Sequence, residues 1–247
     1  MRYKINIEYD GTNLFGWQKQ LDGPSVQGLI EQAIFLTSQQ NVEVYGAGRT
    51  DAGVHAIAQV AHFDLETKLD PFRIREALNA HLKNSLNAPI SITEIEEVAD
   101  DFHARFSAIG RSYIYKIISR RAPLVLEKDR AWWVPIPLDI KKMQKGAKHL
   151  LGNHDFSAFR ATACQAKSPI RTLDVLNIQQ KEDEITFTVE AKSFLHHQVR
   201  NIVGTLKLVG DGTLQAKDIK TILDSKDRTK AGPTAPACGL YLNKVWY

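Results

Sequence analysis

The chain has 247 residues, of which 43% are hydrophobic, and it carries a formal net charge of +4 with a pI near 8.9. This length and composition predict a packed core in one large or two smaller domains and exclude a histone-like basic tail. The mild basic excess permits a nucleic-acid partner without requiring one. The two cysteines, Cys164 and Cys238, lie far apart, so no disulfide framework or zinc motif is predicted.

The N-terminus begins with strand-like sequence and is too polar for a signal peptide. No apolar run approaches the roughly 20 residues that a membrane span requires. We therefore expect a cytoplasmic protein that does not contact membranes.

In chain order, the first half predicts strand, helix, two strands, helix and strand. Alternating apolar residues indicate strands, and apolar residues on one face with capping residues before them indicate helices. The expected elements are strands 3–9, 42–45, 57–65 and 90–98, and helices 24–36 and 70–82.

The second half repeats this order loosely. Its expected elements are strands 111–119, 173–180, 184–193 and 239–247, and helices 139–152, 196–210 and 214–226. Each half thus predicts a ferredoxin-like β-α-β-β-α-β unit, also found in RRM domains, so the fold class is α+β. We expect units 1–105 and 106–247, with antiparallel sheets packed side by side, helices on one face, and a cleft for a polymer on the other.

The string "GRTDAGVHA", residues 48–56, places a charged pair in a glycine-framed loop after an apolar strand. It resembles the signature of the TruA family of tRNA pseudouridine synthases. Further strings match that family in the same order along nearly the whole chain. They are "IEYDG", "FGWQ", "DFHARFSA", "RSYIY", "FLHHQVRNIVG" and "GLYL".

The resemblance implies isomerisation of uridine to pseudouridine at positions 38, 39 and 40 of the tRNA anticodon stem-loop. The N1–C1′ bond breaks, the base turns over, and C5 joins C1′. The implied enzyme uses no cofactor and no metal, and the sequence contains no P-loop, metal-ligand spacing or dinucleotide fingerprint. The resemblance also implies that RNA binds in the cleft expected on the face of the sheets opposite the helices.

Asp51 corresponds to the catalytic aspartate of the family and is implied to be the nucleophile. A carboxylate can form an ester and leave again, although an aspartate in a glycine-rich loop often only caps a turn. The resemblance places Arg200 beside Asp51, where a guanidinium would orient the carboxylate and keep it ionised. On a helix, Arg200 is expected to point away from the stripe formed by Val199, Ile202, Val203 and Leu206.

Three more residues receive roles from the resemblance. Arg49 is implied to assist base flipping, since an arginine can fill the space that a flipped base vacates. Tyr113 is implied to stack on the target uracil and to help remove the C5 proton, although a tyrosine in a strand often serves packing alone. Leu240 is expected to form an apolar wall of the base pocket.

The tRNA phosphates require basic residues for binding. Arg105 and Arg160 are candidates for substrate contacts, with further candidates Arg111, Arg120, Arg121, Lys141, Lys142, Lys145 and Arg171. The resemblance also implies a homodimer in which one tRNA touches both subunits.

Three alternatives are open. The chain could be a pseudouridine synthase that acts on other RNA positions. It could be a non-catalytic RNA-binding protein of two RRM-like units, although no aromatic RNP1-like string is present. It could also be a glycosidase-like hydrolase, although such an enzyme usually needs a second carboxylate near Asp51.

Overall fold

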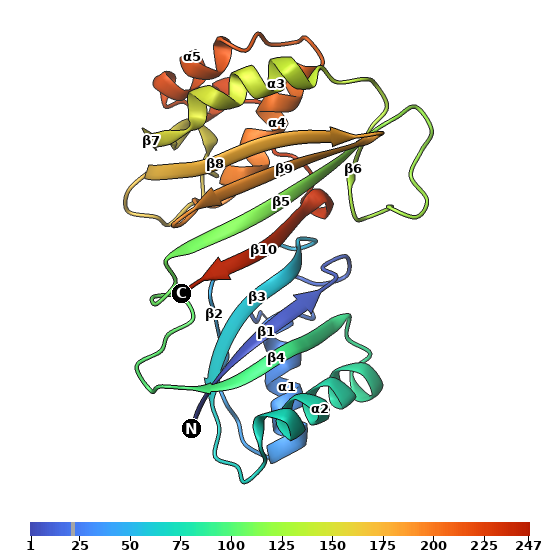
Figure 1. The fold of residues 1–247 in the computed structure, drawn as a ribbon, viewed down its shortest axis with the longest axis vertical. Coiled ribbons are helices and arrows are strands. Elements are labelled where there is room, and N and C mark those ends of the chain that lie inside the picture. The colour runs from blue at the N-terminus through green and yellow to red at the C-terminus, as the bar shows by residue number, and fades with distance from the viewer. Residues whose placement is uncertain (21–22) are drawn as a thin grey trace. The chain divides into compact units, whose positions relative to one another are not determined.

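The computed structural model describes residues 1–20 and 23–247. Contacts divide the chain into two compact units (Figure 1). Unit 1 comprises Met1–Ile109 and Tyr241–Tyr247, and unit 2 comprises Gly110–Leu240. The closing strand thus belongs by its contacts mainly to unit 1, and the division at 105/106 stays a prediction of the sequence pattern.

Unit 1 has the order β-α-β-β-α-β that the sequence predicts. Its elements are β1 (Arg2–Tyr9), α1 (Val26–Ser38), β2 (Tyr45–Gly46), β3 (His55–Asp64), α2 (Pro71–Ala80), a π-helical turn (His81–Ser85) and β4 (Ile90–Val98), and residues 241–246 of β10 (Leu240–Trp246) join them. In β1 every second side chain is buried, from Tyr3 to Tyr9, so one face of the sheet forms the core.

The sheet of unit 1 runs β4-β1-β3, with antiparallel pairs throughout. The outer edge of β3 is shared. Its later part, Ala61 and His62, pairs with β2, while its beginning, His55 and Ala56, pairs in parallel with β10. Strand β2 has only two residues, fewer than the expected strand 42–45, and the chain between β2 and β3 is an irregular loop.

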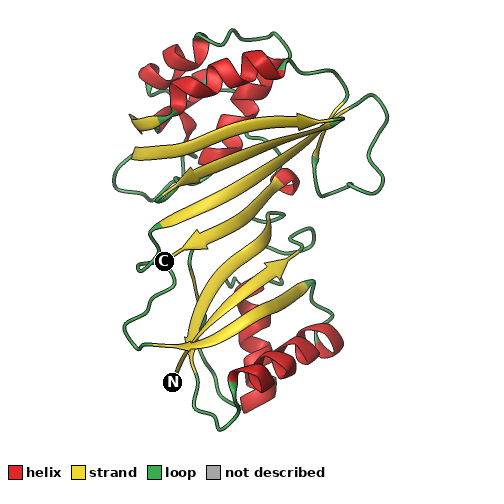
Figure 2. Cartoon of the chain, viewed as in Figure 1, coloured by secondary structure: helices red, strands yellow, loops and turns green. Residues whose placement is uncertain are grey.

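Unit 2 has the sheet order β5-β9-β8-β7, again antiparallel, and β6 pairs in parallel with β5. Figure 2 shows its helices gathered together beside the sheet. The elements are β5 (Gly110–Ser119), β6 (Trp132–Val134), α3 (Ile140–Ala147), β7 (Gly152–Asp155), β8 (Ile170–Lys181), β9 (Glu184–Ala191), α4 (Gln198–Gly210), α5 (Asp218–Ser225) and the 3-10 turns Lys148–Leu150, Ser157–Phe159, Arg228–Lys230 and Ala237–Gly239.

Helix caps follow the sequence. Ser25, Asp70 and Asp139 each accept a backbone hydrogen bond from the first turn of the following helix. Helix α4 begins at Gln198 rather than at the expected residue 196, because His197 has a left-handed backbone with φ of 61°. Within the described residues, the α+β class is confirmed, and no helix is long and apolar enough to cross a membrane.

Candidate active site

Asp51 lies in the loop between β2 and β3, in unit 1 (residues 47–54). Its backbone oxygen accepts a hydrogen bond from Val54 N at 3.1 Å, so the chain turns tightly at this point. Gly53, inside the turn, has φ of 76°, a conformation that glycine adopts without strain. The turn leads directly into β3, which fixes the end of the loop.

A second loop, residues 11–17, holds the Asp51 loop by backbone contacts. Trp17 N donates to Thr50 O at 3.0 Å, and Gly53 N donates to Leu14 O at 3.3 Å. Gly16 has φ of 82°, and a Cβ there would lie 2.5 Å from Thr50 O. The two sequence motifs "FGWQ" and "GRTDAGVHA" therefore meet in space, and glycine is needed where their backbones touch.

Two buried side chains fasten these loops to the sheet, one side chain for each loop. The Tyr9 hydroxyl on β1 lies 2.8 Å from Thr50 Oγ1. At the start of β3, His55 Nδ1 accepts a hydrogen bond from Gly11 N at 3.0 Å, and its ring stacks on Tyr241 with centroids 4.7 Å apart. His55 thus has a structural partner in the neighbouring loop.

The two charged residues of the loop differ in exposure. Asp51 is half-buried, and Arg49 is exposed. The contacts of Trp17 and Tyr9 with Thr50 fix the segment that carries both residues, so the charged pair stands on a rigid support.

In unit 2, Tyr113 and Tyr115 lie on the same face of β5, as the sequence predicts. Tyr113 is buried, and its ring lies edge-on to Phe194 with centroids 5.1 Å apart. Tyr115 is fully buried, and its hydroxyl donates to Pro236 O at 2.8 Å. Burial raises the pKa of Tyr115, so this hydroxyl stays protonated.

Arg200 lies in the first turn of α4, also in unit 2. Most of α4 is buried, and Arg200 is one of its half-buried positions. Its Nε donates to Ala235 O at 2.8 Å, so a backbone carbonyl holds the guanidinium group. Leu240 is buried at the beginning of β10, and Arg160 is half-buried just after the turn Ser157–Phe159.

Arg105 lies in unit 1, in a segment that folds over one face of the sheet (residues 100–107). It is exposed, and its guanidinium lies 5.6 Å from the centre of the Phe106 ring, which is 75% exposed. The backbone of this segment is tied down by His103, whose Nδ1 accepts from Arg105 N at 3.1 Å. The segment therefore presents a cation and an aromatic ring on a fixed turn.

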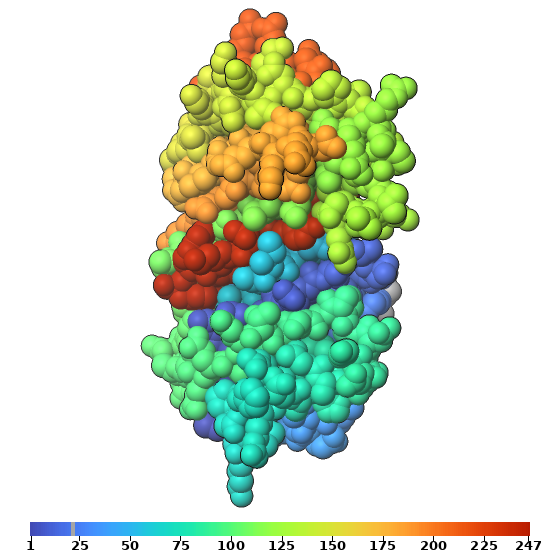
Figure 3. All heavy atoms as spheres, turned by 45° about the vertical axis from the view of Figure 1, so that its right-hand side comes forward, coloured from blue at the N-terminus to red at the C-terminus, as the bar shows by residue number. Residues whose placement is uncertain are grey.

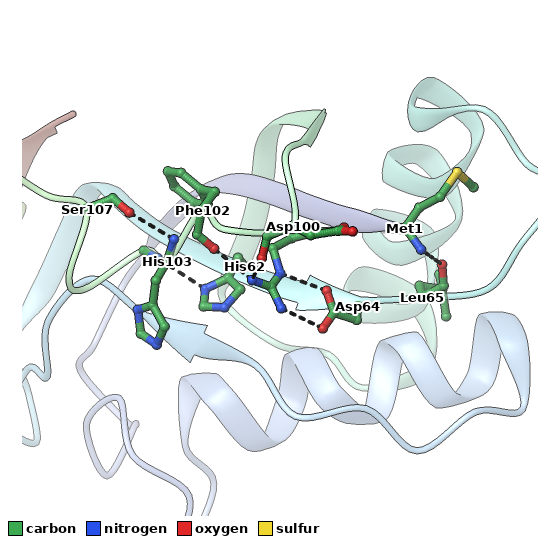
Figure 4. Close-up of polar contacts among 10 residues, drawn as sticks. Met1, His62, Asp64, Leu65, Asp100, Phe102, His103 and Ser107 are labelled. Atoms are coloured by element: carbon green, nitrogen blue, oxygen red, sulfur yellow. Dashed lines mark hydrogen bonds and ion pairs between the residues drawn. The ribbon is translucent and has the colours of Figure 1, made fainter.

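Arg2 and His62 anchor that segment, and Figure 4 shows His62 beside Asp64, Asp100, Phe102 and His103. Arg2 makes a two-pronged ion pair with Asp64, with both N–O distances at 2.8 Å, and also donates to the carbonyl oxygens of Asp100 and Phe102. His62 Nδ1 accepts from Ala104 N at 3.2 Å. Burial, reinforced by His103 and Arg2, lowers the pKa of His62 to about 4, so the ring is neutral near pH 7.

The other basic candidates occupy different surroundings. Arg111 is buried and donates to Lys192 O at 2.7 Å, whereas Arg120 and Arg121 are exposed at the end of β5. They begin the loop between β5 and β6, whose light-green atoms stand out from the surface of unit 2 in Figure 3. Lys141, Lys142 and Lys145 are exposed on α3, and Arg171 is half-buried.

The sequence did not predict the backbone groups that hold Asp51, Arg200 and Tyr115 in place. The loop at residues 11–17 and the carbonyls of Ala235 and Pro236 are backbone partners, which leave no signal in side-chain chemistry. Glycine at residue 16 and the proline-containing string "GPTAP" at residues 232–236 were the available hints.

Comparison with known families now gives the class of the protein. The sequence profile of the family described as tRNA pseudouridine synthase matches residues 5–107 and 147–247. The matched residues include the Asp51 loop and α4, which carries Arg200, whereas β5 with Tyr113 lies outside them. The chain is therefore an isomerase.

Three curated relatives agree with this class. Each is called tRNA pseudouridine synthase A, and each matches over the whole of this chain. They come from Paramagnetospirillum magneticum (54% identical, 95% of the relative covered), Rhodospirillum centenum (51%, 99% covered) and Parvibaculum lavamentivorans (50%, 99% covered). The chain belongs to the tRNA pseudouridine synthase family.

Proposed function

We propose that the protein converts uridine to pseudouridine at positions 38, 39 and 40 of the tRNA anticodon stem-loop. The observation that carries this proposal is the identity of at least 50% to each of three relatives called tRNA pseudouridine synthase A, over the whole chain. The reaction moves no atom out of the substrate except a proton. The bond between N1 and C1′ breaks, C5 bonds to C1′, the C5 proton leaves, and N1 gains a proton.

Asp51 is the proposed nucleophile. Its loop is held by backbone hydrogen bonds to Leu14 and Trp17, which gives the carboxylate a defined position at low entropic cost. The carboxylate forms an ester with the substrate while the base turns over, and it leaves when C5 and C1′ join.

Four residues complete the proposed site. Arg200 pairs with Asp51 and favours its ionised form. Arg49 enters the space that the flipped uridine leaves, Tyr113 stacks on the uracil and helps to remove the C5 proton, and Leu240 forms an apolar wall. Support for these roles comes from the family motifs, and for Arg200 also from the carbonyl that holds its Nε.

We also propose that Arg105 and Arg160 contact the tRNA backbone. The protein is proposed to act in the cytoplasm as a homodimer, as the family resemblance implies. Sedimentation with and without tRNA tests the assembly, and a monomeric active complex would contradict it.

The experiment uses tRNA labelled with tritium at uracil C5. We expect the wild-type protein to release tritium to water and Asp51→Asn to release none. Asp139→Asn is the matched control, because Asp139 caps α3 and pairs with the exposed Lys142, and asparagine is an equally good cap.

Three other results would count against the proposal. No release by the wild type indicates a protein that only binds RNA, and free uracil indicates a hydrolase. Release from tRNA with product at other positions indicates a different substrate choice.

A further inference from the structure

Residues 231–236 form a strap that lies along α4 in unit 2. Ala235 N donates to Arg200 O at 3.1 Å, and Gly232 N donates to Thr205 Oγ1 at 2.9 Å. The approach is so close that a Cβ on Gly204 would lie 1.8 Å from Pro233 O. The strap is therefore packed backbone against backbone, and its position is tightly defined.

Two neighbouring carbonyls of the strap hold two polar side chains. Ala235 O accepts from Arg200 Nε at 2.8 Å, and Pro236 O accepts from the Tyr115 hydroxyl at 2.8 Å. Because Nε–H lies in the plane of the guanidinium group, the bond to Ala235 restricts the orientations that this plane can take. A displacement of the strap would thus rotate Arg200.

Arg228 ties the strap to α4. Its Nη1 donates to Gly232 O at 2.9 Å, and its Nη2 donates to Asn201 Oδ1 and Thr234 Oγ1, each at 3.1 Å. Thr234 Oγ1 in turn donates to Asn201 Oδ1 at 2.7 Å. One planar guanidinium therefore joins the first part of the strap, up to Thr234, to Asn201, the residue that follows Arg200 in α4.

The four partners of Arg228 that define this arrangement are neutral oxygens, including Ala231 O at 3.4 Å. Burial lowers the pKa of Arg228, so the surroundings desolvate its charge. A charged group in this place is costly unless its hydrogen bonds are all made, and lysine cannot form the same planar fork. The arrangement suits the precise placement of a backbone segment.

We propose that Arg228 is a positioning residue for the isomerisation. Acting through the strap and Asn201, it sets the orientation of Arg200, and it does not itself touch the tRNA. This inference rests on the proposed function, in which Arg200 pairs with the carboxylate that attacks the substrate.

Arg228→Ala in the full chain tests the inference by tritium release from labelled tRNA, with kcat and KM measured separately. We expect kcat to fall about 10- to 100-fold while KM stays near the wild-type value, because a small misplacement of a catalytic group costs this much and RNA contacts are unchanged. Guanidinium chloride below denaturing concentration should restore part of the rate, since the free ion can occupy the vacated site.

Controls separate position from stability. Ile178→Val trims a buried side chain of β8 in the same unit, so it should lower Tm and leave kcat unchanged. Lys230→Ala removes an exposed charge from the same 3-10 turn and should change neither. Should Arg228→Ala fold poorly, Thr234→Val removes one link of the network with little change in volume and should give a smaller fall in kcat.

The inference is overturned by a wild-type kcat in Arg228→Ala and Thr234→Val, by a rise in KM alone, or by a failure of guanidinium to restore the rate. Failure of the proposed function looks different. In that case the wild type releases no tritium, or Asp51→Asn releases it normally.

Discussion

The two regions that carry the candidate residues are held in different ways. In unit 1, the Asp51 loop is fixed mainly by backbone hydrogen bonds to residues 11–17 and by glycines at their contacts. In unit 2, Arg200 is held by a strap that packs its backbone against α4 and is also tied to α4 by the side chains of Asn201, Arg228 and Thr234. A backbone-held loop should resist most side-chain changes, whereas a side-chain network should fail when one member is lost.

The largest expected effects come from glycines at the backbone contacts. Gly16→Ala and Gly204→Ala would place a Cβ at 2.5 Å and 1.8 Å from a carbonyl oxygen, and each should destabilise its unit by at least about 3 kcal/mol or prevent folding. Urea unfolding measures the loss.

Gly212→Ala is the control for Gly16→Ala. The two glycines have φ of 83° and 82°, but a Cβ at residue 212 would meet no atom within 4 Å. This variant should lose only about 1 kcal/mol, from backbone strain. Equal losses in the two variants would show that the contact between the loops is not what requires Gly16.

Acid should destabilise unit 1 at a pH where unit 2 is still stable. The pKa of His62 is about 4 in the folded protein and near 6.5 in the unfolded chain, so the unfolded chain binds more protons between these values. The stability of unit 1 is therefore full above about pH 6.5 and falls by roughly 3 kcal/mol as the pH drops to about 4. The pKa of His103 is lowered as well, which acts in the same direction.

The strap network of unit 2 consists of amide, hydroxyl and guanidinium groups, none of which titrates in that range. Hydrogen exchange between about pH 7 and pH 4.5 should thus show protection lost first in β3 of unit 1. His62→Asn keeps an acceptor near Ala104 N and should flatten this pH dependence. Loss of protection in α4 before β3 would contradict the prediction that His62 makes unit 1 the more acid-sensitive unit.

The smallest effects come from two buried tyrosine hydroxyls, one in each region. Tyr9→Phe removes the bond to Thr50, and Tyr115→Phe removes the bond to Pro236. Each should cost about 1 kcal/mol of stability. Because Pro236 follows the residue whose carbonyl holds Arg200, Tyr115→Phe should also lower kcat several-fold, while Tyr9→Phe should leave kcat nearly unchanged. A larger fall in kcat for Tyr9→Phe than for Tyr115→Phe would show that the Asp51 loop depends more on side chains than the strap does.

The sequence predicted those features that depend on local chemistry. The capping residues Ser25 and Asp139 agree with the structure, and the strands expected at 173–180 and 184–193 form β8 and β9, whose connection turns at Glu182 with φ of 53°. Asp70 was expected only as the start of a helix, and it is the N-cap of α2. These depend on a few neighbouring residues, so the pattern contains them.

Features made by distant residues were not predicted. The short strands β6 and β7, the return of β10 to unit 1 and the strap on α4 all depend on partners far away in sequence. Asp51 and Arg200 are proposed through motif resemblance, since a carboxylate in a loop and an arginine on a helix are each common. The network around Arg228 was missed because its acceptors are mostly backbone and neutral side-chain oxygens, which no spacing rule identifies.

The central claim is that the Asp51 carboxylate carries out the isomerisation of tRNA uridines. Its most direct test is to map pseudouridine in tRNA incubated with wild type and with Asp51→Asn, alongside a measurement of tRNA binding by both proteins. The account predicts pseudouridine at positions 38 to 40 only with the wild type, and similar binding by the two. Pseudouridine formed at the wild-type rate by Asp51→Asn would contradict it.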